Sequence, residues 1–282
     1  MNNLRIFFSD NSVLTDFSSS LNYYGGSGKA VTYTVAQDYI YIGQRSPFNH
    51  IYIKLGDTVN AVTANMTAQY WDGKDWIDAV EIIDETSVSG KSLAQSGFIS
   101  FVPNKDKAWE AEDTNYQGSS VTGLTTLVIY DQYWMRLKFN ATLTPAIVLK
   151  WLGYKFCNDS DLAAEFPDLS RQKVRDIYSS GLTTYEEQII RASDLIVSDL
   201  ISKQVIDEVG NILVKDQFKL PCVSKLAELI YQTLGDDYDD NRIIARSEYD
   251  KRMDKSIFKV DTNNNAILDK KENNIRSGFL SR

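Results

Sequence analysis

The hydrophobic pattern of this chain changes its period near residue 156. Before that point, apolar residues alternate or form short runs, as in AVTYTVAQDYIYIG, NHIYIKL and MTAQYW, and turn clusters separate the runs. One such cluster, YWDGKDW, places Asp72-Gly73 among large aromatic residues, which is typical of a hairpin. Many short strands with frequent turns indicate an antiparallel β-sandwich or barrel, and we assign residues 1–156 to a β-sandwich domain. All five tryptophans lie in this half.

After residue 156, apolar residues recur at helical spacing. Thr183 and Thr184 each stand three residues before a glutamate, so either pair can form a capping box at the start of a helix. A second helix is expected from Pro221 to Gly235, and a third over about residues 239–255. The expected core positions are Ile189, Ala192, Ser193, Ile196, Leu200 and Ile201, then Leu226, Ile230 and Leu234, then Ile243, Ile244, Tyr249 and Met253.

Residues 256–282 hold three short apolar islands, SIFKV, AIL and IRSGFL, which polar turns separate. A segment with isolated anchors usually becomes ordered only on a partner. We therefore expect an α+β chain of two domains, in which a small α-helical bundle over residues 157–255 is followed by an extended C-terminal arm.

The charge of the chain argues against tight binding to phosphate backbones. The net charge is −8, and division at Phe156 leaves −3 before it and −5 after it, with no basic stripe in either half. No apolar run reaches the ~18 residues of a membrane helix. The start, MNNLRIFFSDNS, has too short an apolar run for a signal peptide, so we expect a soluble, intracellular product. Cys157 and Cys222 form no metal-binding pattern and are expected to be two buried thiols.

Catalytic motifs are not recognisable, and we do not expect an enzyme. His50 is the single histidine and follows PFN in a strand-like run, which favours a structural role. The stretch SVSGKS fails as a phosphate loop because Glu85 stands where its first glycine is required, and YYGGSGKA fails because Ala30 replaces Ser or Thr. The aspartates of residues 236–240 are best explained as a capped first turn of a helix.

One stretch, DTNNNAILDKKE, resembles the calcium loop of an EF-hand at nearly every position. Two features argue against calcium: Ala266 stands where glycine is nearly obligatory, and the preceding SIFKV looks extended instead of helical. The alternative is a polar turn, which is the outcome we expect, with no cofactor required. If Ca²⁺ binds, its ligands would come from Asp261, Asn263, Asn265, Ile267, Asp269 and Glu272.

Residues 158–282 resemble the small head–tail connector, or adaptor, proteins of tailed bacteriophages. Ala192-Ser193, Ile196, Leu200 and Ile201 are similar to the first long helix of that family, and the link VIDEVGNILVKDQFK ends in Leu220-Pro221 like the start of its next helix. Further similar positions are Leu226, Ala227, Ile230 and Leu234 on the second helix, and Tyr249 and Met253 on the third.

Residues 37–156 resemble β-sandwich domains of phage neck and tail proteins, through the order YWDGKDW, DETS, SGFISFVPNKDKAW and YWMRLKF. Together the two resemblances imply a virion structural protein, assembled in the host cytoplasm, whose dodecameric ring joins the portal protein to tail or neck proteins and lets DNA pass. The family's arm reaches the portal. Its anchors here would be Ile257, Phe258, Val260, Ile267, Leu268, Ile275, Phe279 and Leu280.

The alternative function is a carbohydrate-binding module of a phage tail or tail-associated protein. In that case Trp71, Trp76, Trp109 and Trp134 would form a platform on which sugars stack. Solvent exposure discriminates between the two functions, since a platform needs exposed tryptophans on one face.

Overall fold

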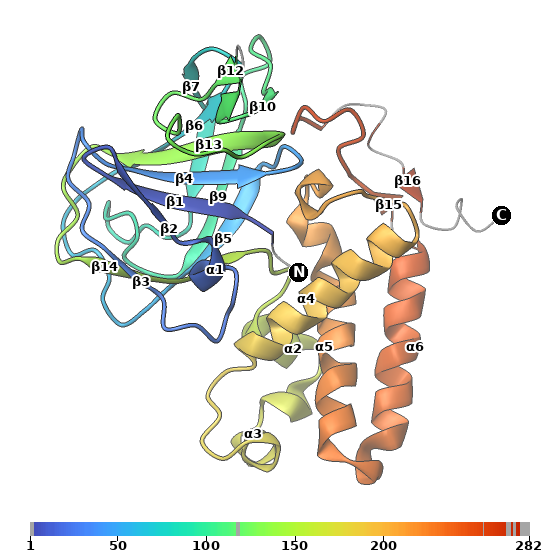
Figure 1. Cartoon of the computed structure of the whole chain (residues 1–282). Coiled ribbons are helices and arrows are strands. Elements are labelled where there is room, and N and C mark those ends of the chain that lie inside the picture. The colour runs from blue at the N-terminus through green and yellow to red at the C-terminus, as the bar shows by residue number, and fades with distance from the viewer. Residues whose placement is uncertain (1–2, 117–118, 256, 269–271, 273–274, 277–282) are drawn as a thin grey trace. The chain divides into compact units, whose positions relative to one another are not determined.

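The computed structural model describes residues 3–116, 119–255, 257–268, 272 and 275–276. The chain divides into two compact units, Met1–Gly153 with Asn263–Ile267, and Tyr154–Thr262 with Leu268–Arg282 (Figure 1). Antiparallel sheets in the N-terminal part and helices in the C-terminal part confirm the predicted α+β class.

Two antiparallel sheets build the first unit, here called the sandwich. The seven-stranded sheet has the order β2 (Val13–Asp16), β1 (Arg5–Asp10), β4 (Tyr39–Gln44), β13 (Gln132–Phe139), β6 (Met66–Trp71) and β7 (Trp76–Asp78), and β10 (Ala111–Glu112) also pairs with β13. The five-stranded sheet has the order β3 (Lys29–Val31), β14 (Ile147–Gly153), β5 (His50–Leu55), β9 (Gly97–Val102) and β8 (Glu81–Asp84). A short helix, α1 (Ser18–Leu21), and a hairpin of β11 (Asn115–Tyr116) and β12 (Ser119–Ser120) complete the unit.

Aromatic side chains join the two sheets. The ring of Trp109 lies 5.5 Å from that of Tyr70 on β6 and 5.9 Å from that of Phe101 on β9, so it contacts both sheets. Its indole nitrogen donates to the carbonyl of Trp134, 3.2 Å away. Large aromatics therefore fill the space between the sheets, as packing of two alternating inner faces requires.

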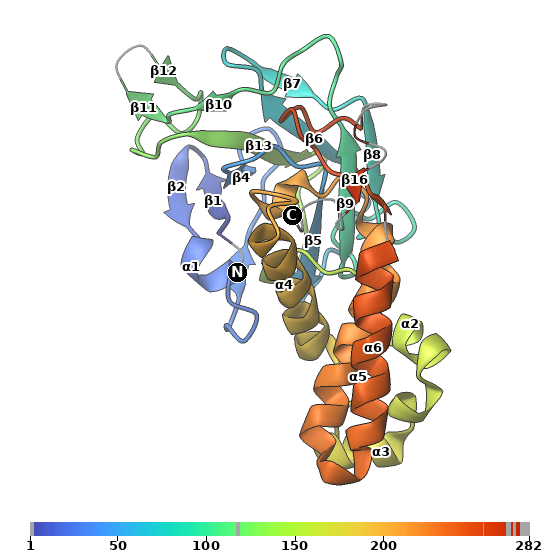
Figure 2. The same ribbon diagram turned by 90° about the vertical axis from the view of Figure 1, so that its right-hand side faces the viewer.

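Helices build the second unit, here called the helical unit, around one apolar core. They are α2 (Asp159–Glu165), α3 (Gln172–Tyr178), α4 (Glu186–Ser202), α5 (Lys219–Leu234) and α6 (Asp239–Lys255), with short 3₁₀ turns between them. Figures 1 and 2 both show α5 and α6 side by side as an antiparallel pair. Gly235 ends α5 with φ of 95°, a conformation that favours glycine.

Several sequence-based details of the helices are wrong. Tyr185, not Thr183 or Thr184, is the N-cap of α4, and its side chain makes no capping hydrogen bond. The Tyr185 amide donates to Asp159 Oδ1 at 2.9 Å, and the Glu186 amide donates to Thr184 Oγ1 at 3.2 Å. The second helix begins at Lys219, two residues before the expected Pro221.

Three expected core positions are exposed instead. Ile243 and Ile244 of α6 are 60% and 59% exposed, and Ile201 of α4 is 42% exposed. The core face of α6 is formed by Ala245, Tyr249 and Met253, so the apolar residues of this helix lie on two faces.

The start of the predicted extended arm belongs to the helical core. Phe258 and Val260 are fully buried, and Val260 forms an antiparallel bridge with Ile212 in the link before α5. Lys259 and Gln217 exchange two hydrogen bonds of 2.7 and 3.1 Å. Residues 257–260 therefore pack on the helical unit, because the apolar link VIDEVGNILVKDQFK supplies the surface that they cover.

Candidate functional site

The outer face of the seven-stranded sheet carries an aligned row of side chains. Strand register places Phe7 opposite Tyr41, Tyr41 opposite Arg136, Arg136 opposite Gln69, and Gln69 opposite Asp78. Directly opposed residues point to the same face of a sheet, so the row crosses five strands on one side. It changes from apolar at Phe7 to charged at Asp78.

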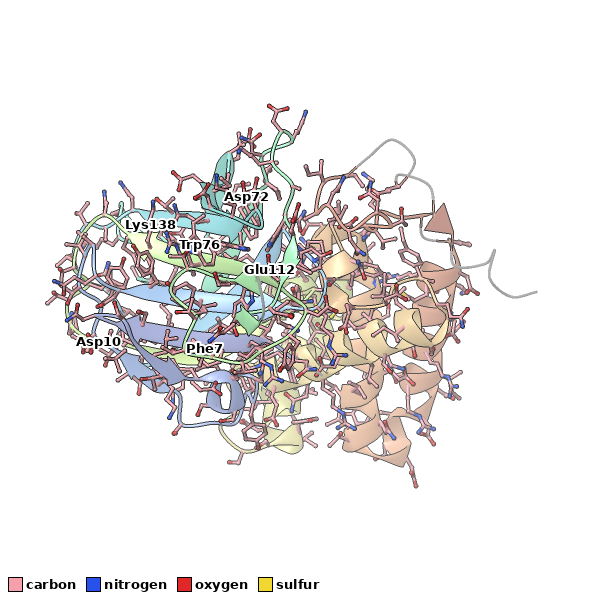
Figure 3. The ribbon with its side chains drawn as sticks, turned by 45° about the horizontal axis from the view of Figure 1, so that its top comes forward. Phe7, Asp10, Asp72, Trp76, Glu112 and Lys138 are labelled. Carbon is pink, nitrogen blue, oxygen red and sulfur yellow. The ribbon has the colours of Figure 1, made fainter. Side chains whose placement is uncertain are left out.

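Arg136 is the centre of this row. Its guanidinium carbon lies 4.1 Å from the ring centroid of Tyr39 and 4.5 Å from that of Trp76, which is a double cation–π arrangement. Its Nε donates to Gln69 Oε1 at 2.6 Å, and Gln69 Nε2 donates to Asp78 Oδ1 at 2.6 Å. In Figure 3, Lys138 and Glu112 lie on either side of Trp76 along this face.

A segment from the loop between β10 and β13 covers the apolar end of the row. Val121 and Leu124 are fully buried there against Phe7, Tyr41 and the tryptophans, and form a second small core. The indole nitrogen of Trp76 donates to the carbonyl of Thr122 at 2.9 Å. Burial under this cover raises the pKa of the Tyr41 hydroxyl. This apolar end of the sheet is thus packed on both faces, whereas at the other end Asp78 is exposed and Lys138 is half-buried.

The tight fit of this cover requires glycine at position 123. A Cβ on Gly123 would lie 2.2 Å from the Tyr41 hydroxyl oxygen, and its φ is +94°. Only glycine adopts that backbone conformation without strain while leaving room for the tyrosine.

The tryptophan platform that the alternative function requires is not formed. Trp71, Trp109 and Trp134 are 2%, 6% and 0% exposed, and Trp76 is half-buried under the cover segment. These side chains are core residues, so the stacking surface required by the carbohydrate-binding alternative is missing from these four positions.

His50 and the two cysteines occupy structural positions. His50 is buried on β5, with its Nδ1 2.7 Å from Asn49 Oδ1. Cys157 and Cys222 are free and buried, as expected, and the Cys157 thiol donates to Cys222 Sγ at 3.0 Å. This hydrogen bond and burial raise the pKa of the Cys157 thiol well above its usual range, so the Cys157 sulfur is held as a neutral thiol.

The calcium-like loop has some but not all features of an EF-hand. Ala266 adopts the left-handed conformation that the sixth position needs, with φ of 56°. Glu272 is buried, and its Oε1 accepts from the amide of Thr262 at 2.7 Å and from its hydroxyl at 3.0 Å. Short strands, β15 (Ile257–Phe258) and β16 (Ile275–Arg276), flank the loop in place of the two helices.

The remaining predicted ligands are placed as follows. Asp261 is buried and its amide donates to the Asn211 carbonyl at 2.7 Å, while Asn263 is exposed. Asn265 Oδ1 accepts from the amide of Ile267 at 2.7 Å, and Asp269 lies outside the described residues. Across the described ranges, no three His, Cys, Asp or Glu side chains gather in a way that could hold a metal ion.

The predicted arm anchors divide into three groups. Phe258 and Val260 are core residues of the helical unit, as described above. Ile267 and Leu268 are half-buried. The side chains of Ile257 and Ile275, and the whole of Phe279 and Leu280, lie outside the described residues.

The helical unit exposes large apolar side chains that the sequence analysis either missed or assigned to the core. These are Ile177 on α3, at 55% exposure, Leu220 at the start of α5, at 47%, and Ile201, Ile243 and Ile244. These residues lie on four different helices, and contiguous exposed apolar patches, more than single residues, mark interaction surfaces. Within the part of the chain that the structure describes, no helix is long and apolar enough to cross a membrane.

Comparisons with family models, with curated proteins and with solved structures found no match.

Proposed function

We propose that this chain is a structural protein of a tailed-phage virion, which forms a ring at the head–tail junction and joins the portal to tail proteins. In this proposal it is an adaptor and not an enzyme, and its DNA contact is that of a passive channel wall.

The observation that carries the proposal is the common core of the helical positions on which the resemblance depends. Ala192, Ile196 and Leu200 of α4, Leu226, Ala227 and Ile230 of α5, and Tyr249 and Met253 of α6 are buried in one cluster. Most of the similar positions therefore determine how the three long helices pack, whereas Ile201 and Leu220 are exposed. The agreement of the buried positions supports a shared helical architecture.

The polar and aromatic side chains interact with one another within the units, which also favours a protein that forms interfaces. Arg136 is stacked between two rings, and Lys155 and Glu186 form a buried ion pair at 3.2 Å. These groups stabilise the units, while exposed aliphatic residues on the helical unit are available to partners.

The portal-binding segment of the proposal starts after Val260, since Phe258 and Val260 are used in the core. Its candidate anchors are Ile267, Leu268, Ile275, Phe279 and Leu280.

Cosedimentation of the purified full chain with the portal ring encoded in the same genome tests the proposal. We expect the chain to sediment with the portal, and the double substitution Phe279→Ser and Leu280→Ser to weaken this binding while the fold is retained. The control is Val80→Ser and Val128→Ser, two exposed sandwich positions that should not change binding. Absence of wild-type binding would contradict the adaptor role.

A further inference from the structure

Two cysteine sulfurs meet in the core of the helical unit. Cys157 Sγ lies 3.0 Å from Cys222 Sγ, and both side chains are buried. The bond of a disulfide measures about 2.05 Å, so these two sulfurs are only about 1 Å further apart than bonded ones. The sequence contains no other cysteine, so each is the only possible disulfide partner of the other within one chain.

Contacts on both sides fix the backbone around Cys157. Before it, the Phe156 amide donates to Ser193 Oγ of α4 at 3.2 Å. After it, Asn158 caps α2 and exchanges two hydrogen bonds of 3.0 Å with Asp161. The position of Cys157 is therefore set by its neighbours in the chain and does not depend on its own sulfur.

Cys222 is held beside Cys157 by the packing of α2 and α4 on α5. It is fully buried on α5, and Ser193 Oγ of α4 lies 3.5 Å from its sulfur. At the start of α5, Lys219 pairs with Asp161 of α2 at 3.6 Å. Three helices therefore keep the two sulfurs adjacent, through contacts that remain when the thiols react.

The pair does not suit a metal ion. A structural zinc site needs four ligands from cysteine, histidine or carboxylate side chains. Over the residues that the structure describes, no third His, Cys, Asp or Glu joins the two sulfurs in a way that could hold a metal. The chemistry open to two thiols in contact is oxidation to a disulfide.

We infer that Cys157 and Cys222 form a disulfide in the folded helical unit when the protein meets a low-molecular-weight disulfide. Cys157 reacts first, because it is 4% exposed whereas Cys222 is fully buried. Its thiol loses a proton, and the sulfur attacks the oxidant to give a mixed disulfide and one small thiol. The Cys222 thiol then loses its proton, and its sulfur attacks that of Cys157 and displaces the second small thiol. The two protein thiols thus lose two protons and two electrons, which leave in the two small thiols.

The bond would join the segment after β14 to α5 and link positions 65 residues apart. Such a link restricts the unfolded chain and so stabilises the folded unit. Burial and the raised pKa make the Cys157 thiol slow to react, so the pair stays reduced in a reducing cytoplasm and closes in an oxidising medium. In the proposed virion protein, the bond would then form after assembly, outside the host cell. This timing rests on the proposed function, whereas the bond itself does not.

Incubation of the reduced, folded full chain with hydroxyethyl disulfide, a small neutral oxidant, tests the bond. We expect the thiols that can be titrated in denaturant to fall from two to none. The mass of the chain should fall by that of two hydrogen atoms, with no adduct. The melting temperature should rise by roughly 5–10 °C and return to its first value after dithiothreitol is added.

Cys157→Ala and Cys222→Ala are the matched controls, and neither should have a melting temperature that changes with the oxidant. The mass and the thiol count of the wild type decide the inference even if a variant folds poorly. A lasting adduct on one cysteine would overturn it, and so would two unreacted thiols under conditions that fully oxidise the urea-unfolded chain. An oxidised chain that melts no higher than the reduced one would also overturn it. Portal binding is measured separately with reduced thiols, so failure of this inference and failure of the adaptor proposal are distinguishable.

Discussion

Phe258 stacks on Phe218 in the core of the helical unit, with ring centroids 5.1 Å apart and an interplanar angle of 17°. Phe218 precedes α5, whereas Phe258 follows α6, so this contact closes the unit around both helices. A chain cut after Lys255 would lose Phe258 and Val260, and it would test folding before it tested any arm.

Replacing Phe258 with Ala should destabilise the helical unit by about 3–5 kcal/mol, the usual cost of removing a buried phenylalanine ring. Urea unfolding followed by far-UV circular dichroism measures this loss. Ile244→Ala removes a side chain that is 59% exposed and should cost less than about 1 kcal/mol. Equal effects of the two substitutions would mean that residue 258 is not a core position.

Leu200→Asp and Ile201→Asp form a matched pair on α4. Leu200 is fully buried and Ile201 is 42% exposed. A carboxylate at position 200 would be buried in an apolar core, so we expect loss of helical circular dichroism, with a cost of at least about 3 kcal/mol. The same change at position 201 should leave the spectrum and the melting temperature nearly unchanged. An unaltered Leu200→Asp protein would refute the core assignment.

Gly123→Ala should loosen the segment that covers the outer face of the seven-stranded sheet. The new Cβ would meet the Tyr41 hydroxyl oxygen in addition to the strain of a positive φ. Gly90→Ala introduces the strain alone, since φ is +75° there and the nearest atom of a Cβ is 3.8 Å away. We expect Gly90→Ala to cost about 1–2 kcal/mol of stability. Gly123→Ala should cost more and should increase proteolytic cleavage within residues 111–131. Similar losses of stability in Gly123→Ala and Gly90→Ala would show that the segment around Gly123 is not tightly packed on the sheet.

Tyr185 should make the helical unit less stable in strong alkali. Burial raises the pKa of its phenol from 10.0 to about 12, and the hydroxyl donates to the Leu169 carbonyl at 3.2 Å. The folded state favours the neutral phenol, so this stabilisation is complete below pH 10.0 and is lost as the pH rises through about 12. The neutral Tyr185 phenol contributes about 2–3 kcal/mol to the free energy of unfolding below pH 10.0. Tyr185→Phe should reduce the fall in unfolding free energy over that window, whereas Tyr23→Phe, at a site with 68% exposure, should not. An identical fall in wild type and Tyr185→Phe would contradict the assignment.

The loop of residues 261–272 should not need calcium. Alanine occupies the sixth position, and strands flank the loop in place of helices. We expect the melting temperature to be the same with added Ca²⁺ and with chelator. A rise with Ca²⁺ that disappears in Glu272→Ala would show that the loop is a metal site.

Local patterns in the sequence predicted much of the fold. Alternation predicted the strands, the spacing from Ile189 to Leu200 predicted α4, and Gly235 marked the end of α5, because these signals depend on neighbours along the chain. The orientation of α6 could not be predicted, since apolar residues occur on two of its faces and packing on α5 selects the face with the small Ala245. Likewise, the burial of Phe258 and the stacking of Arg136 depend on partners distant in sequence, such as Phe218 and Tyr39.

The central claim is that this chain forms a ring on a portal. Negative-stain electron microscopy of the full chain mixed with the portal ring of the same genome tests it most directly. We predict a second ring of density, coaxial with the portal and with an open central channel, in class averages of the mixture. Portal particles that look the same with and without a molar excess of the chain would contradict the account.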